Sequence, residues 1–146
     1  MKYDQSELAF RVLFSLIFLG LGMEHLFSDA VIRAMMPDWI IGQRWVSLAS
    51  GAILLTGGSL ILLGYRMRLG ALLLGGFLLL VTAVIHGPNL IVRPSDLPHE
   101  WGWLWDVYQR SNFFKNLCLL GGCFYFYNHE PGRYSLHQLK NKASAK

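Results

Sequence analysis

The sequence predicts an all-α fold, an integral membrane four-helix bundle with an extra interfacial amphipathic helix in the loop between spans 3 and 4. Three observations lead to this prediction. The chain of 146 residues is 53% hydrophobic, with a mean hydropathy of +0.37. Only 15% of the residues are charged, whereas soluble domains average about 25%. The apolar stretches reach the length of about 20 residues that a helix needs to cross a bilayer. These values exclude a small soluble enzyme.

The charge and cysteine content of the chain limit the classes of partner and ligand that we expect. The net charge of +4 comes from scattered residues and a short basic tail, a pattern that fits anionic lipid headgroups better than a nucleic-acid groove. Cys118 and Cys123 are five residues apart, so on a helix they point about 140° away from each other and make poor joint metal ligands. We expect membrane lipids as partners, no nucleic acid and no bound metal.

The first span is expected over about residues 7–27. Its charged side chains stand near the ends, with Arg11 toward the start and Glu24 and His25 toward the finish, where long side chains can reach the headgroups. Glu7 precedes Arg11 by four residues, so the two share a helix face and can form an ion pair. We interpret Arg11 as a basic side chain that reaches to the interface beside this neighbour, and a contact with a ligand is the alternative.

The second and third spans are expected over about residues 45–65 and 69–87. Residues 45–65 contain no charged side chain, and residues 69–87 contain His86 as their only ionisable side chain. Both lengths suit a helix that crosses the hydrocarbon core. The short turn between the two stretches carries Arg66 and Arg68, and we expect it to join two antiparallel helices.

Small residues indicate where the spans pack, because helices in lipid gain little from the hydrophobic effect and need close backbone approach. Ser50, Gly57 and Gly64 recur every seven residues and predict one seam on the second span. Further small residues follow on the third and fourth spans: Gly70, Gly75, Gly76 and Ala83, then Gly121 and Gly122. Close packing is the default interpretation. Gaps that admit a flat ligand, such as a quinone or a lipid, are the alternative.

The fourth span is expected over about residues 112–128, with Lys115 in its first turn near the headgroups. Trp and Tyr rings suit the same depth, because each joins an apolar body to a polar tip. Three of these aromatic residues and one leucine recur at helical spacing just before this span: Trp101, Leu104, Trp105 and Tyr108. They predict the interfacial amphipathic helix.

Residues 1–130 are expected to form the single membrane domain, and residues 131–146 a loosely ordered basic cytoplasmic tail. Four spans put both termini on the same side of the membrane. Eight of the 13 Lys and Arg residues fall on that side and five on the other, so the positive-inside rule places both termini in the cytoplasm. We expect a multi-pass protein of the inner (cytoplasmic) membrane.

The candidate site lies at the opposite, outer mouth of the expected bundle. Six polar residues gather there: Glu24, His25, Arg44, His86, Lys115 and Asn116. The default interpretation is that these side chains pair and cap helices at the interface. In a second interpretation Lys115 or Arg44 holds an anionic or carbonyl oxygen of a ligand, and a histidine relays a proton. A metal or haem site on the two histidines is the third, although no tight ligand spacing such as HExxH supports it.

Several segments, taken in order, carry a family resemblance. They are Gly20-Leu-Gly-Met-Glu-His25, the stretch Gly51-Ala-Ile-Leu-Leu-Thr-Gly-Gly58, residues 63–69, His86, and Asn112-Phe-Phe-Lys-Asn-Leu117. Together they resemble the DoxX-like family of small four-span membrane proteins, over roughly residues 8–128. The resemblance implies the four-helix bundle independently of hydropathy. Many members of that family carry a glutamate where this chain has Leu54.

The resemblance also implies a function. The family is named after a subunit associated with thiosulfate oxidation that passes electrons to quinone, so we expect an accessory subunit of membrane-linked, quinone-coupled oxidation. Its cofactor would be a quinone and its partner a redox enzyme or another protein. The alternative is a non-catalytic scaffold that anchors a partner protein through the Trp-rich outer segment, and a small-solute transporter is third. The sequence leaves open the oligomeric state, the ligand and whether the protein is an enzyme.

Overall fold

A computed structural model describes residues 2–34, 36–37, 39–95 and 97–144 of the chain. These described residues form helices joined by turns, without a strand, so the all-α prediction is confirmed. The long helices are α1 (Lys2–Phe27), α3 (Gln43–Leu62), α4 (Met67–Val81) and α5 (Gly102–Asn128), and the short ones are α2 (Asp29–Ala34) and α6 (Leu136–Ser144). Helix α4 continues into a π turn, η1 (Thr82–His86), and two 3₁₀ turns follow, η2 (Pro88–Leu90) and η3 (His99–Trp101).

Three helices in the described part of the chain are long and apolar enough to cross a membrane, and they span Tyr3–Phe27, Gln43–Leu62 and Met67–His86. They coincide with the first three predicted spans. Helix α5 is as long as α1 but does not belong to this group, because charged side chains such as Arg110 and Lys115 lower the hydropathy of its first half. The chain is a membrane protein, and its fourth span stays a prediction.

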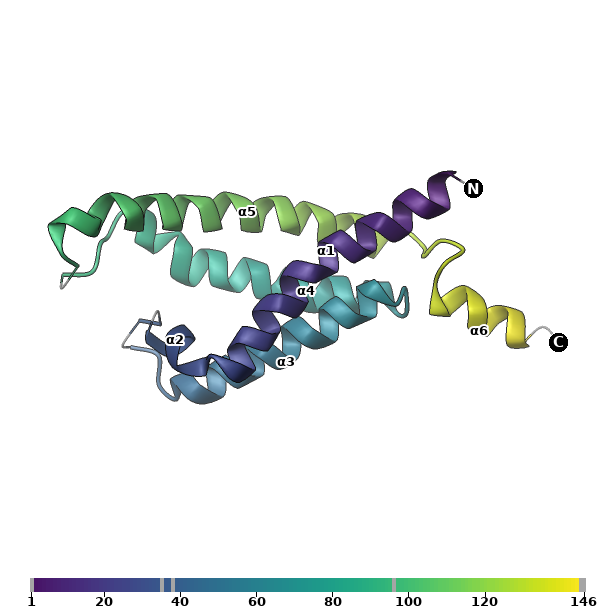
Figure 1. Cartoon of the computed structure of the whole chain (residues 1–146), viewed down its shortest axis with the longest axis horizontal. Coiled ribbons are helices and arrows are strands. Elements are labelled where there is room, and N and C mark those ends of the chain that lie inside the picture. The colour runs from purple at the N-terminus through teal and green to yellow at the C-terminus, as the bar shows by residue number, and fades with distance from the viewer. Residues whose placement is uncertain (1, 35, 38, 96, 145–146) are drawn as a thin grey trace.

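The long helices pack in chain order, α1 on α3, α3 on α4 and α4 on α5. Figure 1 shows α4 and α5 running side by side, while α1 crosses obliquely from the α5 side to the α3 side. Both ends of the chain lie at the same end of the bundle, which also holds the α3–α4 turn. We call this the inner end, and the opposite end, with α2 and the start of α5, the outer end.

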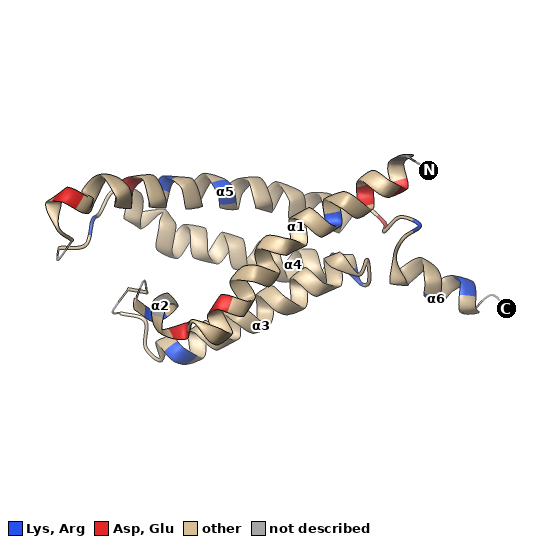
Figure 2. Ribbon diagram, viewed as in Figure 1, with Lys and Arg blue, Asp and Glu red and all other residues tan. Residues whose placement is uncertain are grey.

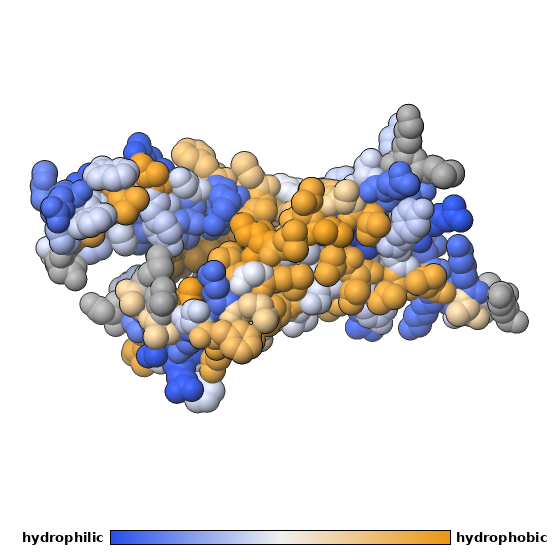
Figure 3. Space-filling view, in the orientation of Figure 1, coloured by the Kyte–Doolittle hydropathy of each residue, from blue (hydrophilic) through white to orange (hydrophobic). Residues whose placement is uncertain are grey.

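The surface agrees with a lipid environment. Figure 2 shows most charged residues toward the two ends of the bundle, and Figure 3 shows a band of hydrophobic side chains between them on the visible face. Large apolar residues such as Leu13 on α1 and Leu80 on α4 are mostly exposed. A soluble monomer rarely leaves so continuous an apolar band in contact with water. The band therefore marks the part of the molecule that lipid surrounds.

Aromatic side chains join α1 to α5 in the inner half of the bundle. The ring of Phe126 lies 4.8 Å from the ring of Phe10 and 4.9 Å from that of Phe14, measured between centroids. Phe14 also contacts Phe18 at 5.1 Å. Gly122 on α5 makes room for the Phe14 ring, since a Cβ atom there would overlap it. This cluster closes the bundle at its inner half.

Two glycine pairs let helix backbones touch. A Cβ atom on Gly22 of α1 would lie 3.2 Å from the carbonyl oxygen of Gly51 on α3. A Cβ atom on Gly70 of α4 would lie 2.9 Å from the carbonyl oxygen of Gly57 on α3. Real Cβ atoms essentially never approach a neighbour below 3.0 Å. The crossing of α3 with α4 therefore requires a glycine on α4.

The predicted seam on the second span is right only in part. Gly57 lies in the α3–α4 contact, but α3 ends at Leu62, so Gly64 is not on the helix. Gly64 instead turns the chain with a φ of 60°, a left-handed conformation that glycine adopts without strain. Gly76 and Gly121 have no neighbour within 4 Å of a would-be Cβ atom. A seven-residue repeat marks one face only while the helix continues.

Arg11 is fully buried at the inner end, which corrects its interpretation as a side chain that reaches to the interface. Its Nε lies 2.7 Å from Oε1 of Glu7, the pair that the spacing of four residues predicts. Its other nitrogens donate to two backbone carbonyls, one of Leu62 at 3.1 Å and one of Tyr134. Arg11 therefore ties α1 to the end of α3 and to the segment before α6.

The tail after Pro131 forms the short helix α6, where the sequence predicts loose order. Its first turn is fixed to the bundle by backbone hydrogen bonds. The Leu136 N–H donates to the Leu63 carbonyl at 2.9 Å, and the His137 N–H donates to the Gly64 carbonyl at 3.4 Å. Since an isolated helix of this length is marginal in water, these bonds to the α3–α4 turn start it.

At the outer end, the residues expected to form the interfacial helix belong to η3 and the first turns of α5, and α5 continues without a break through residues 112–128. Their position in a membrane interface stays a prediction. The preceding loop is held to α5 by an ion pair, with Arg93 Nη2 2.5 Å from Asp106 Oδ2 and Arg93 Nε 2.9 Å from Oδ1. These hydrogen bonds hold the pKa of Asp106 below its usual value. Gly102 lies under the guanidinium, where a Cβ atom would come within 2.7 Å of Nη1.

Candidate functional site

The six predicted site residues lie in the outer half of the molecule, divided between two helix pairs. Glu24 and His25 are on α1, and Arg44 is on α3. The other three belong to the pair of α4 and α5: His86 ends the π turn, and Lys115 and Asn116 follow each other on α5. Glu24 and Arg44 are exposed. The two groups are described separately below.

His25 belongs to the contact between α1 and α3. Its Nδ1 lies 3.1 Å from the hydroxyl oxygen of Ser47, which is fully buried. Gly51 lies so close to His25 that a Cβ atom on the glycine would be 2.9 Å from the His25 Cβ. Sequence reasoning missed Ser47, although a polar side chain one turn before Gly51, on the same buried helix face, was a usable signal. This arrangement fits helix packing.

His86 is held by a buried amide of α5. Its Nδ1 lies 2.8 Å from Oε1 of Gln109, and the Gln109 side chain is buried. An amide oxygen only accepts hydrogen bonds, so in this arrangement the imidazole Nδ1 is the donor to Gln109. The edge of the Tyr108 ring faces the imidazole at 6.4 Å between centroids. Sequence reasoning did not identify Gln109.

Lys115 is half-buried on α5 and has an amide partner. Its Nζ donates to Oδ1 of Asn112 at 2.6 Å, one turn earlier on the helix. Within the part of the chain that the structure describes, no carboxylate forms an ion pair with it. The α4–α5 pair thus carries a histidine and an uncompensated ammonium group at the same end.

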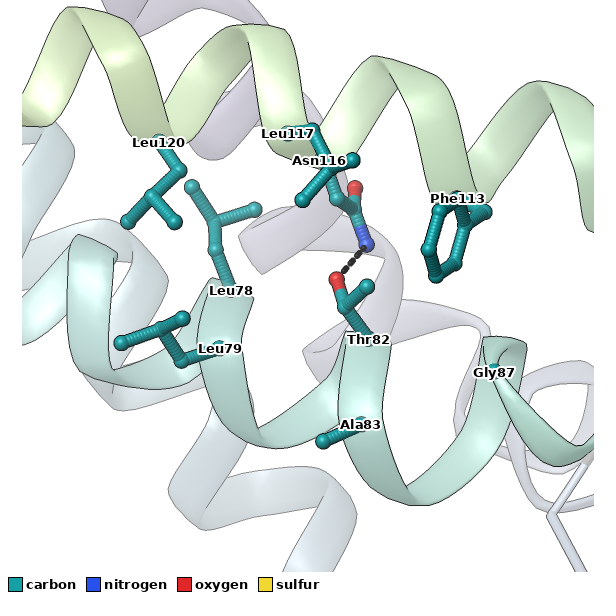
Figure 4. A pocket seen from close by; sticks show the side chains of 9 residues that line it. All are labelled: Leu78, Leu79, Thr82, Ala83, Gly87, Phe113, Asn116, Leu117 and Leu120. Carbon is teal, nitrogen blue, oxygen red and sulfur yellow. Dashed lines mark hydrogen bonds between the residues drawn. The ribbon is translucent and has the colours of Figure 1, made fainter.

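Asn116 lies in an apolar crevice between the end of α4 and α5. Its Nδ2 donates to the Thr82 hydroxyl at 3.0 Å, and both side chains are buried. The crevice has a volume of about 230 Å³, and Figure 4 shows its side chains around this hydrogen bond. Six apolar residues form its walls: Leu78, Leu79, Ala83, Phe113, Leu117 and Leu120. Leu79 and Leu117 are exposed on the outside, so the crevice opens toward lipid.

The π turn shapes this crevice. From Thr82 the helix widens, and the Gly87 N–H donates to the Thr82 carbonyl at 2.7 Å, five residues back. The extra residue in the turn places Ala83 and Gly87 at the rim of the crevice. Single π turns inside α-helices are rare and are frequent at functional sites. The continuous apolar pattern of residues 69–87 gave no signal of it.

The chemistry of the crevice suits one flat ring with a hydrogen-bond acceptor. An apolar cavity of about 150 Å³ holds a benzene molecule, so a volume of about 230 Å³ accommodates a substituted six-membered ring. The amide of Asn116 has a second N–H hydrogen beyond the one given to Thr82. Among the described residues, no three His, Cys, Asp or Glu side chains lie together as a metal would require.

The sequence model of the family described as DoxX matches residues 6–87 of the chain. No curated protein and no solved structure matches the chain. The matched region begins at the fifth residue of α1, contains α2, α3, α4 and the whole π turn, and ends before α5. Leu54, where the family resemblance predicts a glutamate in many members, is a leucine buried in the core.

Proposed function

The chain belongs to the DoxX family, and from this premise we propose that it is an accessory membrane subunit that binds a quinone for membrane-linked oxidation. In this proposal residues 112–128 of α5 form the fourth span, the protein lies in the inner membrane, and both termini are cytoplasmic. Three features of α5 support its role as a span. It has 27 residues, it packs along α4, and its inner half is apolar up to Asn128.

The crevice between the π turn and α5 carries the proposal. Its walls are apolar, its volume of about 230 Å³ fits one substituted ring, and its buried polar groups are the Asn116 amide and the Thr82 hydroxyl. A quinone ring is flat and apolar, with carbonyl oxygens that accept hydrogen bonds. The second Nδ2 hydrogen of Asn116 can bind one such oxygen. Because the crevice opens toward lipid, a quinone dissolved in the bilayer can enter without crossing water.

His86 and Lys115 support the proposal as neighbours of the crevice. His86 precedes Gly87 at the rim, and Lys115 precedes Asn116. A quinone takes up protons when it is reduced, and histidine changes its charge near neutral pH. In this proposal His86 exchanges protons with the outer surface, and the Lys115 ammonium favours negative charge that develops on the bound ring. The partner redox enzyme supplies the electrons.

Filling the crevice is expected to abolish quinone binding. Ala83 lies at the rim and is exposed, so Ala83→Phe places a ring in the cavity without disturbing the core. Asn116→Leu keeps the shape but removes the donor, and a lost hydrogen bond of about 1.4 kcal/mol weakens binding about tenfold. Equilibrium dialysis of purified protein in nanodiscs against decylbenzoquinone measures both effects.

Ala52→Phe is the matched control for this experiment, because Ala52 is an exposed alanine on α3 and does not line the crevice. We expect saturable binding to the wild type and to the Ala52→Phe variant, and at least tenfold weaker binding to the Ala83→Phe variant. If the wild type does not saturate, or if both phenylalanine variants lose binding equally, the crevice is not a quinone site.

The scaffold function is the second candidate, and the exposed tryptophans at the outer end favour it. Trp101 and Trp103 are 51% and 64% exposed at the start of α5, and exposed aromatic residues are enriched in protein interfaces. Replacing both with serine is expected to release a partner protein that otherwise co-purifies in mild detergent. The control is Trp45→Ser on α3, because Trp45 is even more exposed, at 75%. Unchanged recovery of the partner would count against this surface.

A further inference from the structure

Helix α6 carries a narrow apolar stripe with a lysine on each side. At 100° per residue, Leu136, Leu139 and Ala143 fall within about 60° of the helix circumference. Lys140 lies about 40° beyond one edge of this stripe, and Lys142 about 60° beyond the other. The amide side chains of α6 lie on the opposite face. Such a helix, apolar on one side with lysines at the borders, is typical of a helix that lies in a membrane interface.

The described part of the chain leaves this stripe uncovered. Leu136 is 44% exposed and Leu139 is 61% exposed, although both are large apolar side chains. The backbone hydrogen bonds that hold α6 to the bundle come from its first two residues. The ammonium group of Lys140 lies 6.0 Å from the centre of the Tyr65 ring. Apart from this ring contact, the side-chain hydrogen bonds described beyond the first turn stay within α6, so the helix can settle against another surface.

Helix α6 also begins at the right depth to meet the headgroups. Its first residue, Leu136, is hydrogen-bonded to the carbonyl of Leu63, which directly follows the last residue of the candidate span Gln43–Leu62. The adjacent turn exposes Arg66 and Arg68. Figure 2 shows further basic residues toward this end, and Figure 1 shows α6 leading away from the bundle there. The stripe therefore starts where the hydrocarbon core ends.

We propose that α6 is an interfacial anchor, which lays the stripe of Leu136, Leu139 and Ala143 into the headgroup region of the adjacent leaflet and binds anionic lipid through Lys140 and Lys142. The helix tilts onto the surface about its first turn. The apolar residues enter the boundary with the acyl chains, and the lysine stems reach along it with their charges among the phosphates. Anionic headgroups attract such lysines within about a Debye length. This anchor is independent of quinone binding.

The test measures the depth of α6 in lipid with the full-length protein. Spin labels are attached through Leu139→Cys in the stripe, or through Asn141→Cys on the opposite face, after Cys118→Ser and Cys123→Ser remove the native thiols. Nanodiscs contain phosphatidylcholine alone, or phosphatidylcholine and phosphatidylglycerol in equal parts. Electron paramagnetic resonance then compares the collisions of each label with oxygen, which concentrates in lipid, and with a water-soluble nickel chelate.

In anionic nanodiscs we expect the label at position 139 to collide several-fold more with oxygen than with the nickel chelate, relative to the label at position 141. Lys140→Glu combined with Lys142→Glu should remove this difference, while size-exclusion chromatography shows that the bundle stays intact. Equal nickel access at both positions would overturn the anchor. Lipid burial of position 139 that is the same without phosphatidylglycerol, or that survives the two lysine changes, would overturn the anionic-lipid contact.

Discussion

Arg11→Met is expected to lower the free energy of unfolding by about 3–5 kcal/mol, the usual cost of removing one partner from a buried ion pair. Glu7 would keep its charge in a site that is only 13% exposed, with no arginine 2.7 Å away to compensate it. The carbonyls of Leu62 and Tyr134 would lose their donor as well. Unfolding of the purified protein by sodium dodecyl sulfate in mixed micelles, followed by circular dichroism, measures this change.

The double variant Glu7→Gln with Arg11→Met separates the ion pair from the packing. Without the carboxylate no uncompensated charge is left, so the double variant should be more stable than Arg11→Met alone. Arg11→Lys keeps the charge, but a single ammonium cannot reproduce the planar set of donors that reaches one carboxylate and two carbonyls. A stability of Arg11→Met within about 0.5 kcal/mol of the wild type, as for an ordinary surface change, would contradict the role of this cluster.

The Arg11 cluster shows where sequence reasoning ends. Spacing on one helix predicts the ion pair with Glu7, because the two residues are four apart. It cannot predict the carbonyl of Tyr134, which is 123 positions away along the chain and meets Arg11 only after the tail folds back on the α3–α4 turn. The burial of Arg11 is a property of the tertiary structure, and hydropathy alone places an arginine at the interface.

The membrane spans show the same contrast between features that the sequence predicts and features that depend on the tertiary structure. Hydropathy over about 20 residues predicts the three candidate spans well, because the bilayer imposes one simple requirement on each of them. The resemblance to the DoxX family is confirmed by the match to residues 6–87. The fourth span stays a prediction, because α5 combines an apolar inner half with a polar outer half and its average hydropathy describes neither.

Of the residues that line the crevice, the sequence analysis predicted one as a site residue. It did not predict the shape of the crevice. Asn116 is the predicted residue that lines it, and its partner Thr82 lies 34 positions away along the chain. The widening of the helix at Thr82 depends on the backbone hydrogen bond that the Gly87 N–H donates to the Thr82 carbonyl. Residues 82–87 themselves contain no proline and no Lys, Arg, Asp or Glu that would mark it, although Pro88 follows directly. The predicted grouping of His25 with His86 rested on their equal depth in the membrane, and depth does not say which helices are neighbours.

The second large effect concerns two glycines of α4, whose replacement by alanine is expected to change the stability of the protein in opposite directions. Gly70→Ala is expected to destabilise the protein by about 1–3 kcal/mol, the range for overpacking at a tight contact. The new Cβ atom would lie 2.9 Å from the carbonyl oxygen of Gly57. A backbone atom cannot rotate away as a side chain can, so α3 and α4 must move apart and lose their contact.

Gly76→Ala is the matched control, since it makes the same chemical change six residues further along α4. No atom lies within 4 Å of the position that its Cβ would take, and alanine favours a helix over glycine by up to about 1 kcal/mol. The same detergent titration should therefore show Gly70→Ala below the wild type and Gly76→Ala at or above it. Because both changes replace glycine by alanine within α4, opposite signs indicate the tight contact of position 70 with α3. Equal shifts of the two variants would mean that the α3–α4 crossing is looser than the structure describes.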